Sequence, residues 1–420
     1  MPTYIAKTFQ GLETVLADEL TALGATKVQV LKRGVSFEGD TRLLYEANLW
    51  ARTALRILVP ISSSVCADQE ALYKFAKSIN WGDYMSVSDT FMLDSTVNSE
   101  VFTHSNYASL KVKDALCDWF RERTEKRPNV NTEIPTLRIH VHISGIKVDI
   151  LLDSSGEALF RRGYRPQDGA HEAPINEVLA AGLILMTGWR GETNFYDPFC
   201  GTGTFLVEAA MIAKNIAPNR LRYSYAFHRW RNFDEKLWNA IRLESNRKIK
   251  PLKVRIEGSD NSPISIEIAE KAILRARLDE DIEVNTLSFK HIPPRKNGGI
   301  LVTNPPYGER LDVNGHIKDF YREIGDCLKL CFIDFNAHII CSNMEALRCL
   351  GLRPSNKVPV FNGKLECQFA HYELYQGTKR VFEEGFVPKP KRNPLELYQE
   401  TYLKDENTTV ENQEETTEEA

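Results

Sequence analysis

The stretch Asp197-Pro198-Phe199-Cys200-Gly201-Thr202-Gly203-Thr204 decides the fold of the larger part of this 420-residue chain. It follows an apolar segment that ends at Tyr196 and precedes a helical pattern from residue 205 to about residue 215. A strand, a glycine-rich turn and a helix in this order begin a doubly wound α/β sheet, in which ligands bind over the carboxyl ends of the strands. Gly201 and Gly203 permit a tight turn and a close approach of the backbone to a ligand.

The turn lacks one feature of a dinucleotide site. Position 206 is leucine, so the third glycine of that fingerprint is absent. The N-terminus of the following helix offers unpaired N–H groups to an anionic group, and Asp197 suits a ligand that bears an ammonium group. Asp260 ends the next predicted strand, where an acid can bind both hydroxyls of a ribose. A ligand with ribose, ammonium and carboxylate groups is S-adenosylmethionine. Each motif alone also occurs as a structural cap, so the prediction depends on their occurrence together and in order.

A second stretch, Asn304-Pro305-Pro306-Tyr307, presents hydrogen-bond acceptors on a stiff frame. It follows the apolar residues 299–303, which we expect to form a strand. The Asn304 side-chain oxygen and the Pro305 carbonyl can accept both hydrogen bonds of one planar amine, while the prolines fix φ and remove two backbone donors. Tyr307 offers a ring on which a base can stack. We therefore predict chemistry on an exocyclic amino group, with Asn304, Pro305, Pro306 and Tyr307 as the catalytic residues.

The two halves of the chain differ in pattern. From about Ala173 onward, helical and strand patterns alternate as in a parallel α/β sheet. The first 165 or so residues instead combine short strands with amphipathic helices. Residues 136–143 alternate as a strand with His140 and His142 on its polar side, where a solvent-facing pair is favoured over metal ligands. The eight cysteines include no Cys-x-x-Cys pair, so we expect no metal site.

The composition indicates a globular protein of the cytoplasm. Hydrophobic residues make up 42% and charged residues 26% of the chain. No apolar run approaches the ~18 residues of a membrane span, and no leader pattern opens the sequence. The cysteines are typical of reduced, buried thiols. We expect no membrane partner, and the sequence leaves the oligomeric state unknown.

Charge is distributed unevenly along the chain. The net charge is −4, but residues 405–420 carry seven acids and no lysine or arginine, so the rest has a net charge of +3 (−4 + 7). Residues 214–253 contain eleven lysines and arginines against three acids. This segment is either a solvated helical face or a phosphate-binding surface. Residues 160–165, Phe-Arg-Arg-Gly-Tyr-Arg, either bind phosphate and stack a base or form an interdomain hinge with exposed charge.

Together these motifs resemble a class I S-adenosylmethionine-dependent methyltransferase that methylates amino groups. The N-terminal half, which closes on residues 161–165, resembles a THUMP domain preceded by a small ferredoxin-like domain. Residues 304–311, Asn-Pro-Pro-Tyr-Gly-Glu-Arg-Leu, and residues 173–177, Ala-Pro-Ile-Asn-Glu, resemble the bacterial large-subunit ribosomal RNA methyltransferases of the RlmL/YpsC type. Ser288-Phe289 departs from that pattern, because many relatives have an acid there that contacts the adenine ring.

The resemblance implies a Rossmann-like, seven-stranded, doubly wound sheet and methylation of the exocyclic 2-amino group of a guanine in 23S ribosomal RNA. It implies these domains: 1–43 ferredoxin-like, 44–165 THUMP, 166–385 methyltransferase, and 386–420 a basic linker with a disordered acidic tail. We expect the cofactor-binding residues to be Asp197, Phe199, Gly201, Thr202, Gly203, Thr204, Asp260, Asn261, Phe289 and Asn304. We expect the RNA-binding residues to be Arg161, Arg162, Tyr164, Arg165, Arg229 and Arg231.

Three other functions remain open at this stage. An N(6)-adenine methyltransferase of DNA or RNA can carry the same Asn-Pro-Pro-Tyr motif, and the four residues fit guanine and adenine equally well. A protein glutamine methyltransferase also acts on a planar amide, although it would not need the basic segment. A non-catalytic ribosome-assembly factor could retain the fold, although the glycines, Asp260 and Asn304 are all present.

Overall fold

The computed structural model describes residues 1–166, 174–295, 297–306 and 317–376. It divides into two compact units, each described by itself. The first consists of residues 1–163 and 216–249, and the second consists of residues 164–215 and those from 250 onward. Tyr307 and the predicted linker and tail lie outside the described residues.

The first unit is built on one eight-stranded sheet in the order β2-β3-β1-β4-β8-β7-β5-β6. Its N-terminal elements alternate as β-α-β-β-α-β, the ferredoxin-like order. They are β1 (Thr3–Lys7), α1 (Glu13–Ala22), β2 (Thr26–Leu31), β3 (Gly34–Glu38), α2 (Thr41–Trp50) and β4 (Arg56–Val65). Asp40 caps α2 by accepting the Leu43 N–H.

The long strand β4 joins this part to the rest of the first unit, because it pairs with β1 on one side and with β8 on the other. The sheet continues through β8 and β7 to β5, which pairs with β7 in parallel. The elements of this part are α3 (Gln69–Ser78), β5 (Thr90–Asn98), α4 (Ser105–Thr124), β6 (Asn129–Val130), β7 (Leu137–Ser144) and β8 (Lys147–Asp153). A separate apolar core lies between this half of the sheet and its helices.

Residues 216–249 belong to the first unit although they lie between two elements of the second. They form a short 3-10 helix (Ala226–Arg229) and α7 (Glu235–Arg247). Ala217, Tyr225, Phe227, Trp238 and Ile241 are buried in the core of the ferredoxin-like part. The basic segment is therefore partly an apolar, packed structure, and neither a solvated helix nor a charged surface describes all of it.

The second unit is a seven-stranded sheet in the order β11-β10-β9-β12-β13-β15-β14. Its strands are β9 (Phe195–Asp197), β10 (Ile256–Asp260), β11 (Ile282–Thr286), β12 (Gly299–Thr303), β13 (Phe335–Cys341), β14 (Asn356–Asn362) and β15 (Leu365–Glu373). The pairs from β11 to β13 are parallel, and β15 is antiparallel to both of its neighbours. The predicted seven-stranded α/β sheet is confirmed.

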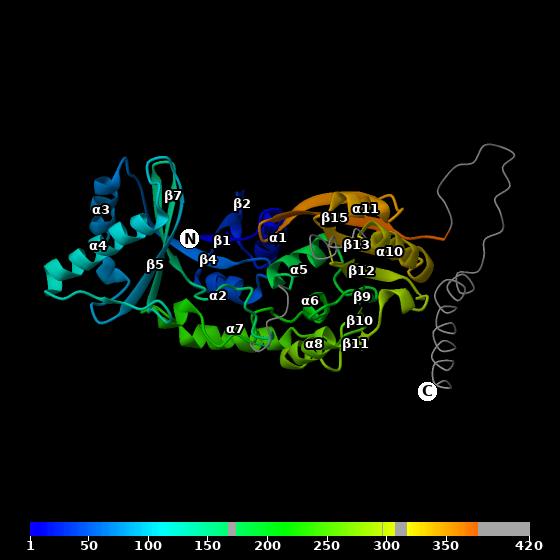
Figure 1. The fold of residues 1–420 in the computed structure, drawn as a ribbon. Coiled ribbons are helices and arrows are strands. Elements are labelled where there is room, and N and C mark those ends of the chain that lie inside the picture. Colours follow the sequence, from blue (N-terminus) through cyan, green and yellow to red (C-terminus); the bar gives the residue numbers. More distant parts are fainter. Residues whose placement is uncertain (167–173, 296, 307–316, 377–420) are drawn as a thin grey trace, which may run out of the picture. The chain divides into compact units, whose positions relative to one another are not determined.

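Helices cover both faces of this sheet (Figure 1). On one face lie α5 (Glu177–Met186), α6 (Thr204–Ala213) and α8 (Pro263–Ala276), and on the other lie α10 (Ile317–Cys331) and α11 (Met344–Cys349). The central strand β9 pairs with β10 and β12, so the carboxyl ends of β9, β10 and β12 meet at one edge. This edge carries both sequence motifs.

Candidate active site

The glycine-rich turn connects β9 to α6 with two left-handed residues, Gly201 at φ +50° and Gly203 at φ +76°. The two glycines have different surroundings. A Cβ on Gly201 would meet no atom within 4 Å, whereas a Cβ on Gly203 would lie 3.1 Å from the Cβ of Ala269 in α8. Gly201 therefore faces open space beside the turn, and Gly203 permits the close packing of α6 against α8. Gly203 is the N-cap residue of α6 and provides no side chain to its first N–H groups, which leaves them available to an anion.

Asp197, at the end of β9, is buried and tied to the second motif. Its Oδ1 accepts hydrogen bonds from the Thr303 hydroxyl at 2.6 Å and from the Phe199 N–H at 3.1 Å. Burial raises the pKa of this carboxyl to about 7, and the nearby Asp260 adds to the shift. Thr303 is the residue directly before Asn304, so a hydrogen bond links the strand ends that carry the two motifs.

Asp260, at the end of β10, is hydrogen-bonded to the main chain of the glycine-rich turn. One of its carboxylate oxygens accepts the Gly201 N–H and the other accepts the Ser262 N–H, both at 3.0 Å. A carboxylate has about four acceptor positions, so two such bonds leave capacity for hydroxyl donors. Asp260 is partly exposed, and Asn261 beside it is exposed.

Aromatic rings form one wall beside the turn. Phe199 lies 5.1 Å from Phe289 and 5.9 Å from Phe320, measured between ring centroids. Phe289 is buried, whereas Phe199 is only partly covered. The position next to Phe289 is Ser288, whose hydroxyl caps the short helix that follows.

Asn304 follows β12 at the same edge of the sheet. Its side-chain oxygen is buried and has no hydrogen-bond partner in the described part of the chain. Pro305 is buried and Pro306 is exposed. A buried amide oxygen without a donor is costly, by about 1–3 kcal/mol, so this oxygen is a candidate acceptor for a donor from a ligand.

The predicted RNA-binding residues of the Arg-Arg-Gly-Tyr-Arg stretch fall in both units. Arg161 is exposed and pairs with Glu157. Arg162 is 1% exposed and donates to the main-chain carbonyls of Leu159 and Arg52. In the second unit, Tyr164 is also 1% exposed, and its hydroxyl donates to Glu208. In this structure Arg162 and Tyr164 are inaccessible to a nucleic acid, and the predicted RNA contact is replaced by a structural role.

The other predicted RNA-binding arginines also have protein partners. Arg165 pairs with the buried Glu177 at 2.9 Å. Arg229 is partly buried and donates to the Pro135 carbonyl, while Arg231 is exposed and donates to the Gly82 carbonyl. Both hold the 216–249 segment to the part of the first unit that follows β4.

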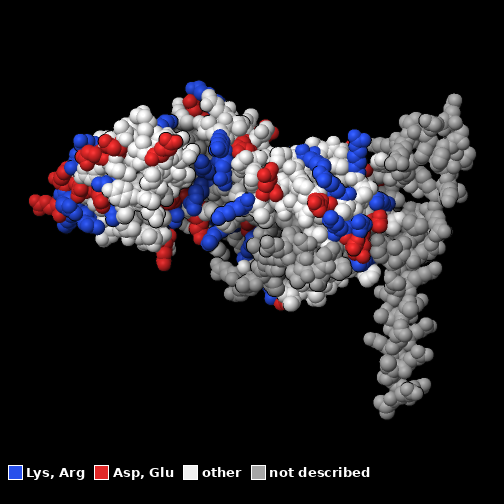
Figure 2. Space-filling view, turned by 45° about the horizontal axis from the view of Figure 1, so that its top comes forward, with Lys and Arg blue, Asp and Glu red and all other residues white. Residues whose placement is uncertain are grey.

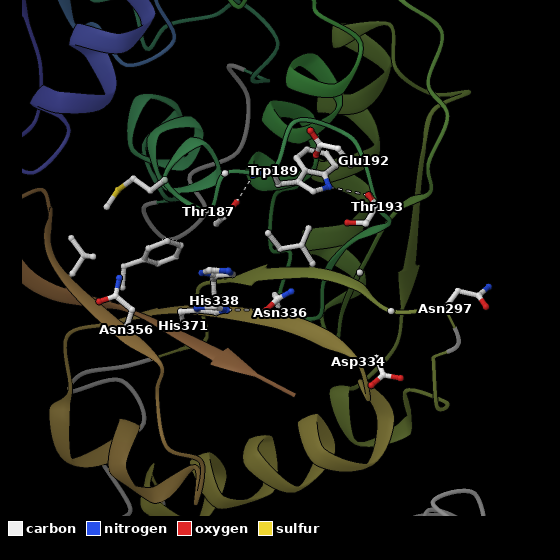
Figure 3. A pocket seen from close by; sticks show the side chains of 17 residues that line it. Thr187, Trp189, Glu192, Thr193, Asn297, Asp334, Asn336, His338, Asn356 and His371 are labelled. Carbon is white, nitrogen blue, oxygen red and sulfur yellow. Dashed lines mark hydrogen bonds between the residues drawn. The ribbon is translucent and has the colours of Figure 1, made fainter. Parts of the chain in front are cut away.

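A cavity of about 740 Å³ lies in the second unit away from these motifs. It is lined at the start of β12 by Gly299, on β13 by His338 and on β15 by His371, with Trp189 from the loop after α5 (Figure 3). The imidazoles of His338 and His371 stack with centroids 4.3 Å apart. None of the predicted site residues lines this cavity, so size alone does not locate the candidate site.

Comparison with known proteins identifies the whole arrangement. Family models match residues 3–58 as an RlmL ferredoxin-like domain, residues 66–153 as a THUMP domain and residues 162–371, half of the chain, as an RMKL-like methyltransferase domain. The chain belongs to the RMKL-like methyltransferase family. The predicted THUMP and ferredoxin-like regions are thereby confirmed. The predicted domain boundaries stay predictions.

Individual relatives of this methyltransferase agree. A protein of a Synechocystis strain named a putative RNA methyltransferase is 38% identical over 89% of this chain and 97% of its own length. The ribosomal RNA large subunit methyltransferase K/L of Psychromonas ingrahamii is 36% identical over 93% of this chain and 52% of its own length. The chain thus spans about half the length of the K/L relatives that it matches.

Solved structures show the same fold. A putative methyltransferase complexed with SAH, S-adenosylhomocysteine, has a TM-score of 0.81 and 27% identity, and covers 90% of this chain and 99% of its own. A possible methylase from Clostridium difficile 630 has a TM-score of 0.81 and 31% identity, over 90% of this chain and all of its own. The cofactor of this methyltransferase is therefore S-adenosylmethionine.

The residues present fit this cofactor. Gly201 faces open space, Asp260 retains acceptor capacity for hydroxyl groups, and α6 has uncapped N–H groups for a carboxylate. Asp197 adds a buried carboxyl group at the same edge. Thr202 and Thr204 complete the turn, with Thr204 buried and Thr202 partly exposed. The contact of each residue with the cofactor stays a proposal.

The described residues contain neither a metal cluster nor a membrane-spanning helix. No group of three or more histidine, cysteine, aspartate or glutamate side chains among them is arranged to hold a metal ion. No helix in the same part of the chain has both the length and the apolar character needed to cross a membrane.

Proposed function

We propose that this methyltransferase transfers a methyl group from S-adenosylmethionine to the exocyclic 2-amino group of a guanine in 23S ribosomal RNA. The observation that supports this best is the buried side-chain oxygen of Asn304, which has no donor among the described residues. It lies at the carboxyl end of β12, beside the strand that leads into the cofactor turn. An amino group with two N–H bonds would supply a donor to this oxygen and a second one to the Pro305 carbonyl.

The mechanism follows from the chemistry of that amine. Conjugation with the base ring makes its lone pair a poor nucleophile. The Asn304 side-chain oxygen accepts a hydrogen bond from one N–H, and the Pro305 carbonyl accepts one from the other. These two bonds favour a pyramidal nitrogen, whose lone pair is directed out of conjugation with the ring. S-adenosylmethionine, when bound, supplies an electrophilic methyl group on a sulfonium. The contribution of the protein is positioning and stabilisation of positive charge on the amine.

The proposal needs no metal and no strong general base. The amine loses its proton only after it has gained a fourth bond, when it is acidic enough for water to accept the proton. The two oxygen acceptors hold the base in place while this happens. The base must be unpaired or flipped out of its helix, at a cost of a few kcal/mol. Stacking on Tyr307 would offset about 1–3 kcal/mol of this cost.

RNA as the substrate is supported by the first unit and by the names of relatives. The first unit contains a THUMP domain, which we infer to bind the RNA, and the Synechocystis and Psychromonas relatives are named as RNA methyltransferases. Figure 2 shows lysines and arginines interspersed with acids on the face it draws, so charge alone does not outline an RNA path. We propose that four arginines contact the RNA backbone: Arg161, Arg165, Arg229 and Arg231. They would do so through the guanidinium N–H groups that their hydrogen bonds within the protein leave available.

The second candidate function is methylation of the 6-amino group of adenine. A solved structure from Listeria monocytogenes, with a TM-score of 0.80 and 28% identity, is named as a predicted N6-adenine-specific DNA methylase. Asn304 and Pro305 fit either amino group, so the site geometry favours neither. The THUMP domain and the names of the sequence relatives favour RNA over DNA.

The role of Asn304 is tested with the purified protein, tritiated S-adenosylmethionine and ribosomal RNA from cells that lack this methylation. We expect Asn304→Ala to lower the rate of methyl transfer by at least about a hundred-fold, because one of two donor-orienting contacts is lost. Asn356→Ala, an exposed asparagine at the start of β14, serves as the control on a surface amide that belongs to neither motif. Wild-type rates in Asn304→Ala would remove the proposed role.

A further inference from the structure

The residues on either side of Asn304 are held by hydrogen bonds from other elements. Before it, the Thr303 hydroxyl donates to Asp197 at 2.6 Å. After it, the hydroxyl of Tyr321 in α10 donates to the carbonyl of Pro306 at 3.3 Å. Asn304 itself retains an unpartnered side-chain oxygen among the described residues. The loop is thus anchored at both ends and open in the middle.

Tyr321 is well placed to be a fixed anchor. It is 0% exposed and belongs to the apolar cluster that α10 and α11 form against the sheet. Its ring therefore has no freedom to follow the loop. A carbonyl can only accept, so Tyr321 is the donor in its hydrogen bond with Pro306.

A thiol on β13 also lies next to this hydroxyl. The Sγ of Cys341 lies 3.2 Å from the Tyr321 hydroxyl oxygen. Burial raises the pKa of Cys341, so the thiol keeps its proton, for which the Tyr321 oxygen and the Asn343 carbonyl, 3.4 Å from Sγ, are both within reach. The Cys341 thiol and the Pro306 carbonyl thus both lie within hydrogen-bond distance of the Tyr321 hydroxyl.

The anchor restricts the torsions that orient the two proposed acceptors. The rings of Pro305 and Pro306 fix φ at both residues, which leaves mainly ψ to vary. A hydrogen bond to the Pro306 carbonyl fixes ψ at Pro306. The bond from Thr303 fixes the strand end before Asn304. The two hydrogen bonds therefore restrain the main chain on both sides of Asn304 and Pro305.

We propose that Tyr321 is a positioning residue for methyl transfer, which holds the Pro306 carbonyl so that the Asn304 and Pro305 oxygens stay aimed at the amine. This inference rests on the proposed function. A displacement of about 1 Å at such a site can cost a hundred-fold in rate.

The test compares Tyr321→Phe with Tyr372→Phe. Tyr372 on β15 is 1% exposed and lies in the same apolar cluster, and none of its described contacts is a hydrogen bond to residues 304–306. We expect Tyr321→Phe to lower kcat about ten- to a hundred-fold, with the Kd for S-adenosylmethionine unchanged within about two-fold. Tyr372→Phe should retain the wild-type kcat. A wild-type kcat in Tyr321→Phe, or a loss of cofactor affinity equal to the loss of kcat, would overturn the proposal.

A second measurement works without any RNA substrate. Pro306-Tyr307 is the only Pro-Tyr pair in the sequence, so labelling with proline carbonyl ¹³C and tyrosine ¹⁵N selects this one peptide in a carbonyl–amide correlation spectrum. Loss of the hydrogen bond should shift the Pro306 carbonyl resonance in Tyr321→Phe and leave it in place in Tyr372→Phe. An unchanged resonance in both would disprove the anchor even if methyl transfer is confirmed. A shift with no methyl transfer by the wild-type protein would instead refute the proposed function alone.

Discussion

At the scale of single residues, the two sequence motifs meet through one hydrogen bond between residues 106 positions apart, Thr303 and Asp197. The motifs themselves could be predicted from sequence, because each is a short run whose chemistry is local. Their junction could not, since a threonine before Asn304 fits any strand end. Tyr321 escapes prediction for the same reason: a tyrosine in an amphipathic helix is typical of a core residue, and nothing local reveals the carbonyl that it reaches.

The buried carboxyl of Asp197 makes stability depend on pH. Its pKa is raised to about 7 from the ordinary value of 3.8. At a pH between these two values, the folded protein therefore binds more protons than the unfolded chain. The free energy of unfolding of the cofactor-free protein should therefore fall as pH rises from about 4 to 7, by at most about 1.4 kcal/mol per pH unit. Asp197→Asn should lack this slope.

The measurement is urea unfolding of both proteins between pH 5 and pH 8. If the difference in unfolding free energy between wild type and Asp197→Asn does not change with pH, the raised pKa is refuted. The proposed contact with the ammonium group adds a further expectation. The cofactor should bind more tightly as pH rises from 6 to 8, because its ammonium group favours the ionised carboxylate of Asp197.

At the scale of elements, the most instructive segment is residues 216–249. Its basic composition is evident from the sequence, but its apolar residues Tyr225, Phe227 and Trp238 lie in the core of the ferredoxin-like part. Composition averages over both faces of a segment and so hides the buried one. Composition also fails to distinguish Arg161 from Arg162, which are adjacent in sequence and have the same side chain. One is exposed and the other is enclosed by main-chain carbonyls, a difference that depends on residues far along the chain.

That difference can be measured as stability. Arg162→Ala should lower the free energy of unfolding of the first unit by about 3 kcal/mol, because it removes charge-assisted hydrogen bonds and leaves buried carbonyls unpaired. Arg161→Ala should change it by less than about 0.5 kcal/mol, since an exposed ion pair contributes little. Hydrogen exchange of the β4 amides reports on the first unit separately. Equal effects of the two substitutions would contradict the assigned structural role of Arg162.

At the scale of the whole molecule, the parallel part of the sheet in the second unit, from β11 to β13, was predictable because its motifs occur in order along the chain. The continuous eight-stranded sheet of the first unit was not. The strand β4 that joins its halves contains Pro60 and three consecutive serines, 62–64, and the register shifts between Pro60 and Ser62. A strand with a proline at an irregularity and polar residues lacks the alternating apolar pattern on which prediction depends.

The central claim is the identity of the methylated atom. The most direct measurement is to react the full chain with isotope-labelled S-adenosylmethionine and undermodified ribosomal RNA, to digest the RNA to nucleosides and to identify the labelled nucleoside by mass spectrometry. Our account predicts label in 2-methylguanosine, absent from the reaction with Asn304→Ala. Label in 6-methyladenosine, or label in DNA but not in RNA under the same conditions, would contradict it.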